Sequence, residues 1–301
     1  MSLWLAATLF AASVQALRFL LQKRLAVSGL SPAAATFARF VYAPPAIALG
    51  LGAWMAVRGG TLPAIAPGFW PFAVAGGVAQ ILATICVVAL FARRNFAVGI
   101  AFSKVTVLMT VAVGWLVLGE TVSGPALAAM LVGFAGVVIL SVPADAVGAG
   151  RLQVLNRASA LGLASGAFFS VSAVAYRGAT LAVEAEAAIL RAAVTLGLVT
   201  LIQAALLGGW LAWRDRTGLA AVARRWRATA LVGATSLAGS MGWFTAYTLQ
   251  TAAYVNAVGQ VELVLSMAIS WLVLGERQTP RELAGIALVG ASVAGIVLLR
   301  G

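Results

Sequence analysis

The sequence contains no histidine, a single cysteine (Cys86) and only 8 acidic residues in a chain of 301. Histidine and cysteine are the main ligands of zinc, haem and iron–sulfur clusters, so their scarcity argues against a metal centre and against Cys-His catalysis. One cysteine also rules out a disulfide framework. No Walker A sequence is present, which argues against ATP hydrolysis by this chain. We therefore expect neither a cofactor nor a metal.

Hydrophobic residues make up 62% of the chain and charged residues only 9%. A soluble domain of this size does not need so much apolar surface, so the composition is typical of an all-α membrane protein. A membrane-spanning helix needs about 20 apolar residues, and the hydrophobic runs predict ten such spans joined by short connections. The predicted spans are Leu3–Gln22, Pro32–Val57, Phe69–Ala92, Phe96–Leu118, Val122–Val142, Ala158–Tyr176, Ala187–Leu211, Thr229–Leu249, Val255–Leu274 and Pro280–Leu299.

The net charge of +12 is concentrated in alternate connections, which favours lipid-facing and cytoplasmic loops over nucleic-acid binding. Thirteen basic residues lie in the odd-numbered loops and three in the even loops and termini. The positive-inside rule then predicts odd loops in the cytoplasm and both termini outside it. The basic residues of the odd loops are Lys23, Arg24, Arg93, Arg94, Arg151, Arg157, Arg214, Arg216, Arg224, Arg225, Arg227, Arg277 and Arg281.

One sequence unit occurs twice. Residues Phe102–Glu120 and Val258–Glu276 both form a long apolar segment that ends in Trp-Leu-Val-Leu-Gly-Glu. Phe10–Arg18 likewise aligns with Phe169–Arg177. We expect two five-helix repeats, residues 1–142 and 158–301, joined by a loop at residues 143–157. Because five is odd, the second copy must enter the membrane from the opposite side, which predicts an inverted repeat around a central cavity.

The paired helix endings, a basic residue late in spans 1 and 6 (Arg18, Arg177) and an arginine early in spans 2 and 7 (Arg39, Arg191) resemble the drug/metabolite transporter superfamily, in its ten-helix EamA-type branch. The resemblance covers nearly the whole chain. It implies transport of a small metabolite, often export, without ATP, and it does not fix the substrate. Members are usually drawn with cytoplasmic termini, whereas the charge bias here predicts the reverse.

Glu262 lies near the middle of predicted span 9, where a buried charge costs at least about 2.5–3.5 kcal/mol. It shares a small, polar helix face with Gly259, Ser266 and Ser270, and the related span 4 carries the matching face Ser103, Thr106, Thr110 and Gly114. One interpretation is a cavity wall, in which Glu262 binds a cationic group or a proton. The other is close helix packing.

Lys104 points about 160° away from the Thr106 direction on an ideal helix, so the sequence favours a different neighbour for it. Its open interpretations are a carboxylate or phosphate ligand, an ion pair with Glu262, and snorkelling toward the cytoplasmic side. The candidate substrate-binding residues are Glu262, Lys104, Thr106, Thr110, Gln15, Gln80, Tyr176, Trp243, Tyr247, Asn256, Gln260 and Ser266.

Four arginines near the span ends are candidates either for snorkelling and helix-end hydrogen bonds or for gates that open alternately. They are Arg18, Arg39, Arg177 and Arg191. Glu120 and Glu276 follow Gly119 and Gly275, where glycine is a typical C-terminal helix signal, and we expect turn or gate contacts from these two acids.

The leading hypothesis is a secondary transporter, with export expected, of a small polar metabolite such as an amino acid, with protons as a candidate coupling ion. The alternative is a transporter or flippase of a lipid-linked or amphipathic substrate. An intramembrane enzyme and a passive channel are less well supported, because no histidine is available for catalysis and the repeat favours alternating access. The expected partners are the bilayer and a small molecule, the expected state is a monomer, and the arginine- and alanine-rich composition favours a bacterial inner membrane.

Overall fold

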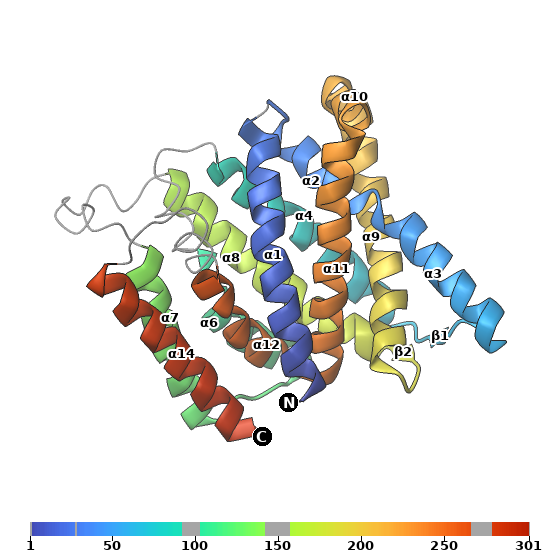
Figure 1. Ribbon diagram of the computed structural model, residues 1–301. Coiled ribbons are helices and arrows are strands. Elements are labelled where there is room, and N and C mark those ends of the chain that lie inside the picture. Colours follow the sequence, from blue (N-terminus) through green and yellow to red (C-terminus); the bar gives the residue numbers. More distant parts are fainter. Residues whose placement is uncertain (1, 28, 92–102, 142–156, 266–278, 301) are drawn as a thin grey trace.

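The computed structural model describes residues 2–27, 29–91, 103–141, 157–265 and 279–300 as a helical bundle with one two-residue ladder (Figure 1). In the first half the helices are α1 (Leu3–Val27), α2 (Pro32–Phe40), α3 (Ala43–Arg58), α4 (Phe69–Phe91), α6 (Thr106–Leu118) and α7 (Gly124–Ser141). In the second half they are α8 (Arg157–Leu181), α9 (Ala188–Arg214), α10 (Arg216–Arg224), α11 (Trp226–Leu249), α12 (Ala252–Gly259) and α14 (Pro280–Arg300).

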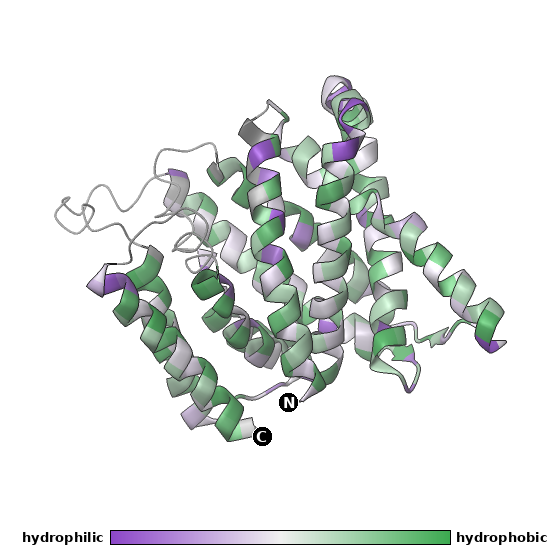
Figure 2. Cartoon of the chain, viewed as in Figure 1, coloured by the Kyte–Doolittle hydropathy of each residue, from purple (hydrophilic) through white to green (hydrophobic). Residues whose placement is uncertain are grey.

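Within the described residues, 5 helical segments are long and apolar enough to cross a membrane, and they are Pro32–Arg58, Phe69–Leu90, Ser159–Leu181, Ala188–Arg214 and Pro280–Leu299. Most of the helical ribbon has the colours of hydrophobic or nearly neutral residues, with few strongly hydrophilic positions (Figure 2). A helix that is apolar all round belongs in a lipid environment or a large core, so the protein is an integral membrane protein. The remaining predicted spans fall on α1, α6, α7, α11 and α12, and the predicted spans Phe96–Leu118 and Val255–Leu274 lie partly outside the described residues. That these helices cross the membrane stays a prediction.

The predicted span Pro32–Val57 matches the membrane-length segment Pro32–Arg58, but this segment is divided into two helices, because α2 ends at Phe40 and α3 begins at Ala43. Pro44 and Pro45 have no N–H to donate to the carbonyls four residues earlier, so the first helix cannot continue through them. Proline is tolerated in the first turn of a helix, which is where α3 holds it. The arginine before this break, Arg39, is thereby carried into the interior of the bundle, where it is only 3% exposed.

Two further breaks fall at aligned positions of the two copies. Lys104 and Val105 form a turn immediately before α6, and Gln260 forms a turn after α12, with helical residues resuming at Val261. The prediction of unbroken helices through these points is therefore wrong. In the alignment of Phe102–Glu120 with Val258–Glu276, Lys104 is the counterpart of Gln260, so both copies are interrupted at the same place.

The helices pack in pairs drawn from both halves of the chain: α1 lies on α11, α4 on α8, and α7 on α14. Lipid supplies no hydrophobic force between helices, so close approach depends on small residues. Gly136 of α7 illustrates this, because a Cβ added there would lie 2.8 Å from the backbone oxygen of Gly285 in α14. The halves are thus interleaved rather than separate bodies (Figure 1).

The connections between the helices lie at the two ends of the bundle. Strand β1 (Ala64–Ile65), after α3, pairs antiparallel with β2 (Val183–Glu184), after α8, and the marked chain ends lie at the same end as this ladder (Figure 1). At the opposite end, Ser31 Oγ donates to Asp215 Oδ2 at 2.7 Å, which joins the loop before α2 to the start of α10. We call these the β1–β2 face and the α10 face.

Helix α10 falls in a connection that the hydrophobic pattern leaves as a loop. It starts because Asp215 caps it, accepting from the Gly218 N–H at 2.8 Å. Hydrogen bonds from Ser31 and from the Gly218 backbone lower the pKa of the Asp215 carboxyl, since both stabilise its charged form.

Candidate functional site

A cavity of about 290 Å³ lies between the two halves of the bundle. Its walls combine polar side chains with aromatic rings, and they include both sides of the two aligned helix breaks. The lining residues are Gln15, Phe19, Arg39, Gln80, Val87, Ser103, Lys104, Thr106, Phe169, Ser172, Tyr176, Ser240, Trp243, Phe244, Tyr247, Asn256, Gly259, Gln260, Glu262 and Leu263.

Glu262 is the central acid of this cavity and is 6% exposed. Its Oε2 accepts from Gln15 Nε2 at 2.7 Å and lies 3.8 Å from Lys104 Nζ. The Gln15 amide oxygen in turn accepts from Arg18 Nη2 and from Trp243 Nε1, each at 3.1 Å. Because Gln15 is held on both ends of its amide, the position of the carboxylate is fixed from α1.

Lys104 therefore lies beside Glu262, which agrees with the ion-pair interpretation, although the ideal helix favoured a different neighbour. That geometric argument assumed a continuous helix at 100° per residue. The turn at Lys104–Val105 interrupts the helix, so the ideal angle does not apply across it. Lys104, Thr106 and Glu262 consequently border the same cavity.

Arg39 enters the cavity from α2, held by neutral groups from two other helices. Its Nε donates to Ser236 Oγ at 3.0 Å and its Nη1 to Thr84 Oγ1 at 2.7 Å. With its amide oxygen turned toward the guanidinium, Gln80 accepts from Arg39 Nη2 at 2.6 Å and donates to Ser172 Oγ at 2.5 Å. Snorkelling is therefore the wrong interpretation for this arginine.

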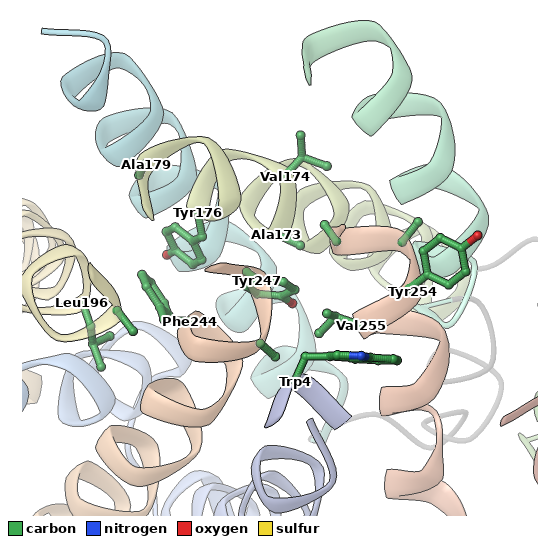
Figure 3. Close-up of a cluster of buried hydrophobic side chains, with 14 of the residues drawn as sticks. Trp4, Ala173, Val174, Tyr176, Ala179, Leu196, Phe244, Tyr247, Tyr254 and Val255 are labelled. Atoms are coloured by element: carbon green, nitrogen blue, oxygen red, sulfur yellow. The ribbon is translucent and has the colours of Figure 1, made fainter. Parts of the chain in front are cut away.

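A second polar chain runs from α11 to α6 beside the cavity. Tyr247 Oη donates to Asn256 Oδ1 at 2.8 Å, and Asn256 Nδ2 donates to Thr110 Oγ1 at 2.9 Å. The aromatic wall lies above it: the rings of Tyr176 and Phe244 are 4.4 Å apart between centroids, and both lie near Tyr247 in Figure 3. The cavity lining thus combines hydrogen-bonding groups with apolar ring surface.

The cavity brings together most of the residues chosen from the sequence. Ten of them line it, namely Glu262, Lys104, Thr106, Gln15, Gln80, Tyr176, Trp243, Tyr247, Asn256 and Gln260. Thr110 reaches it only through Asn256. Ser266 lies outside the described residues.

The four arginines proposed as gates occupy different surroundings. Arg18 is 2% exposed and lines a narrow void beside the cavity, which Arg39 also borders, so snorkelling is wrong for Arg18 as well. Arg191 is half-buried on α9 and does not line the cavity. Arg177 is held at the β1–β2 face by Glu120.

Arg177 and Glu120 form the second ion pair of the described chain. The same guanidinium donates from Nη1 to the backbone oxygens of Tyr247 at 2.7 Å and Gln250 at 2.9 Å. Glu120 follows Gly119, whose φ of 65° ends α6 in a left-handed cap, as the sequence predicts. These contacts tie together α8, the end of α6 and the end of α11 on one face.

Sequence reasoning missed several lining residues. Ser172, Phe169 and Phe244 carry no charge and sit in apolar runs, so nothing in their own sequence context marks them. Arg39 was selected only as a gate, although its position inside a span is the usual signal of an intramembrane site. The repeated segment Phe169–Arg177 contains two of these residues and could have directed attention to them.

A bundle of apolar helices around a buried polar cavity defines a membrane protein that handles a small molecule inside the bilayer. Residues 156–298 match the family model described as the EamA-like transporter family. This match to a family of the drug/metabolite transporter superfamily agrees with the resemblance drawn from the sequence and covers the second half of the chain. The family implies a membrane transporter of small substrates.

Among solved structures, a protein determined by crystallography superposes with a TM-score of 0.68 at 18% sequence identity, covering 98% of each chain. This likeness shows that the fold is shared along the whole chain. No curated protein matches the sequence.

Proposed function

We propose that the protein is a secondary transporter that exports a small polar metabolite by alternating access around the Glu262 cavity. The observation that carries the proposal is a buried acid at the meeting point of two interrupted helices, one from each half of the chain. Interrupted helices at a midplane site between repeats are a recurrent feature of secondary transporters.

The proposed architecture is ten spans in two inverted repeats, residues 1–142 and 158–301, joined by residues 143–157. The helix packing supports it. Exchanging the two halves turns the α1–α11 pair into α8–α4 and leaves the α7–α14 pair unchanged. A contact pattern that survives this exchange is what a pseudo-two-fold axis between the halves would produce.

The proposed gate on the β1–β2 face is the Arg177–Glu120 pair with its backbone contacts to Tyr247 and Gln250. In alternating access such a cluster must open when the opposite side closes. The β1–β2 ladder and the two chain ends lie on this face, and the charge bias of the loops favours it as the extracytoplasmic face of a bacterial inner membrane. A reporter fused at Gly301 that is active only in the cytoplasm would refute this orientation.

Protons are the proposed coupling ion, because Glu262 is a buried carboxylate that lines the cavity. The substrate contacts proposed are the cavity-lining residues chosen from the sequence, with Lys104 either paired to Glu262 or bound to substrate in different states of the cycle. In the proposed cycle, the state with the Lys104–Glu262 pair alternates with the state in which Lys104 binds substrate.

The test is uptake into proteoliposomes with a panel of metabolites, comparing wild type with Glu262→Gln. The matched control is Glu186→Gln, the same change in an exposed loop outside the cavity. We expect the control to transport normally and Glu262→Gln to lose most transport while remaining folded. Full transport by a well-expressed Glu262→Gln protein with unchanged pH dependence would refute the role proposed for this carboxylate.

A further inference from the structure

Among the residues that the structure describes, the charges around the cavity do not balance. Three cationic side chains, Arg18, Arg39 and Lys104, border the cavity or the narrow void beside it. Glu262 is the only acidic residue of the described chain that borders either space. With all four groups ionised, this region carries a net charge of about +2.

The hydrogen-bond acceptors of Arg39 and Arg18 are neutral groups, so they do not cancel the positive charge of the two arginines. Arg39 donates to the hydroxyls of Ser236 and Thr84 and to the Gln80 amide, all of which are neutral. Arg18 donates to the Gln15 amide oxygen, and its Nε has no hydrogen-bond partner in the described structure. Hydroxyl and amide groups orient a guanidinium but do not neutralise it.

Glu262 cannot serve both arginines and Lys104. Its Oε2 already faces Lys104 at 3.8 Å and accepts from Gln15 at 2.7 Å. Uncompensated buried charge is strongly unfavourable, and within a membrane such charges are paired or mark a substrate pathway. An anion in the cavity would remove the imbalance, and Arg39 is the arginine that lines the cavity itself.

We propose that the transported substrate is a small organic anion whose carboxylate or phosphate group binds Arg39. This inference rests on the proposed transport function, because transport provides the route by which the anion reaches the cavity. Arginine suits these groups because its planar fork can donate two parallel hydrogen bonds. The rings of Trp243, Phe244 and Tyr247 line the same cavity and provide surface for an apolar part of the molecule. The volume of about 290 Å³ limits the substrate to a small one.

The test measures thermal stabilisation of the purified protein by three pairs of probes that share a shape and differ in charge. The pairs are succinate with succinamide, glycerol 3-phosphate with glycerol, and N-acetylphenylalanine with its amide. We expect at least one anion to stabilise the wild type, with its neutral counterpart without effect, because a ligand stabilises only the state that binds it. Lysophosphatidate in place of glycerol 3-phosphate distinguishes a lipid anion from a soluble one.

Arg39→Gln should weaken binding of that anion by about tenfold or more, since it removes a charge-assisted hydrogen bond. Arg39→Lys, which keeps the charge and loses the fork, should bind with intermediate affinity and provides a variant if Arg39→Gln fails to fold. Arg58→Gln, the same change at the exposed end of α3, is the matched control.

The inference would be overturned if no anion stabilises the wild type, if neutral probes act equally well, or if the Arg39 variants bind the anion like the control. Uptake of the bound anion into proteoliposomes separates this inference from the proposed function. Binding without uptake would support the anion site and refute transport. Uptake of a neutral or cationic solute without anion binding would support transport and refute the anion site.

Discussion

Removing one charge of the Lys104–Glu262 pair should destabilise the protein more than removing both. Glu262→Gln keeps the shape of the side chain and the acceptor for Gln15, but it leaves Lys104 without its acid. Lys104→Met leaves the carboxylate without its ammonium group. The double variant removes both charges and leaves nearly the same volume, so the uncompensated charge created by each single variant is absent.

The size of the effect follows from the geometry. At 3.8 Å and an effective dielectric constant of about 20, the attraction is about 4 kcal/mol before the cost of desolvation. Breaking a buried pair from one side costs about 3–5 kcal/mol. The side chains are 13% and 8% exposed and border the cavity, so we expect a value at the lower end, about 3 kcal/mol. The double variant should lose about 1 kcal/mol or less.

The assay is thermal unfolding of the four proteins in the same detergent, read as a double-mutant cycle. We expect both single variants to melt several degrees below wild type and the double variant to recover most of the loss. All three should lose transport, because each lacks at least one of the two charges. If the effects of the single variants simply add, the two charges do not interact and the ion-pair argument fails.

Three other predictions follow from described contacts. Arg177→Gln and Glu120→Gln should each lower uptake several-fold because the β1–β2 face loses its ion pair, and exchange of the two charges should restore part of it; normal uptake by both single variants would exclude the gate. Gly259→Ala should destabilise by about 1–3 kcal/mol, because a Cβ there would lie 2.5 Å from the indole of the cavity wall, whereas Gly290→Ala meets open space and should be neutral in a melting assay. The lowered pKa of Asp215 means that its contribution to α10 is present above about pH 4, the usual value, and is lost as the pH falls through the lower folded value. Asp215→Asn should therefore increase hydrogen exchange in α10 at neutral pH, and the difference from wild type should vanish in acid.

Composition and repetition were sufficient to predict an all-helical membrane protein and its family, because each depends on long stretches of sequence. Much of the cavity lining was predicted for the same reason: polar residues inside apolar spans are rare, and Glu262, Lys104 and Gln15 stood out against their neighbours. The left-handed cap at Gly119 was predicted from a local signal that needs only a few residues.

The helix breaks were not predicted, although they decide how the site is built. The break before α3 could have been read from the adjacent prolines. The turns at Lys104–Val105 and Gln260 have no proline, and their residues are compatible with a continuous helix, so only the tertiary packing locates them. Ser172 and Phe244 were missed because an uncharged residue shows its function only when the opposite wall of the cavity is known.

The proposed repeat explains why the charges of the site are divided between the two halves. At the aligned positions the first copy has Lys104 and Thr106, and the second has Gln260 and Glu262. All four line one cavity, so two identical copies would bring like charges together, which is unfavourable in a buried site. Because the two copies have diverged, the cavity instead holds one basic residue from the first half and one acidic residue from the second, and these two form an ion pair.

Because each half supplies one member of the pair, a motion that separates the halves at this point must break the contact. In the proposed alternating-access cycle the Lys104–Glu262 pair would therefore persist in only one of the two states, and its loss in the other state would free Lys104 to meet a substrate anion.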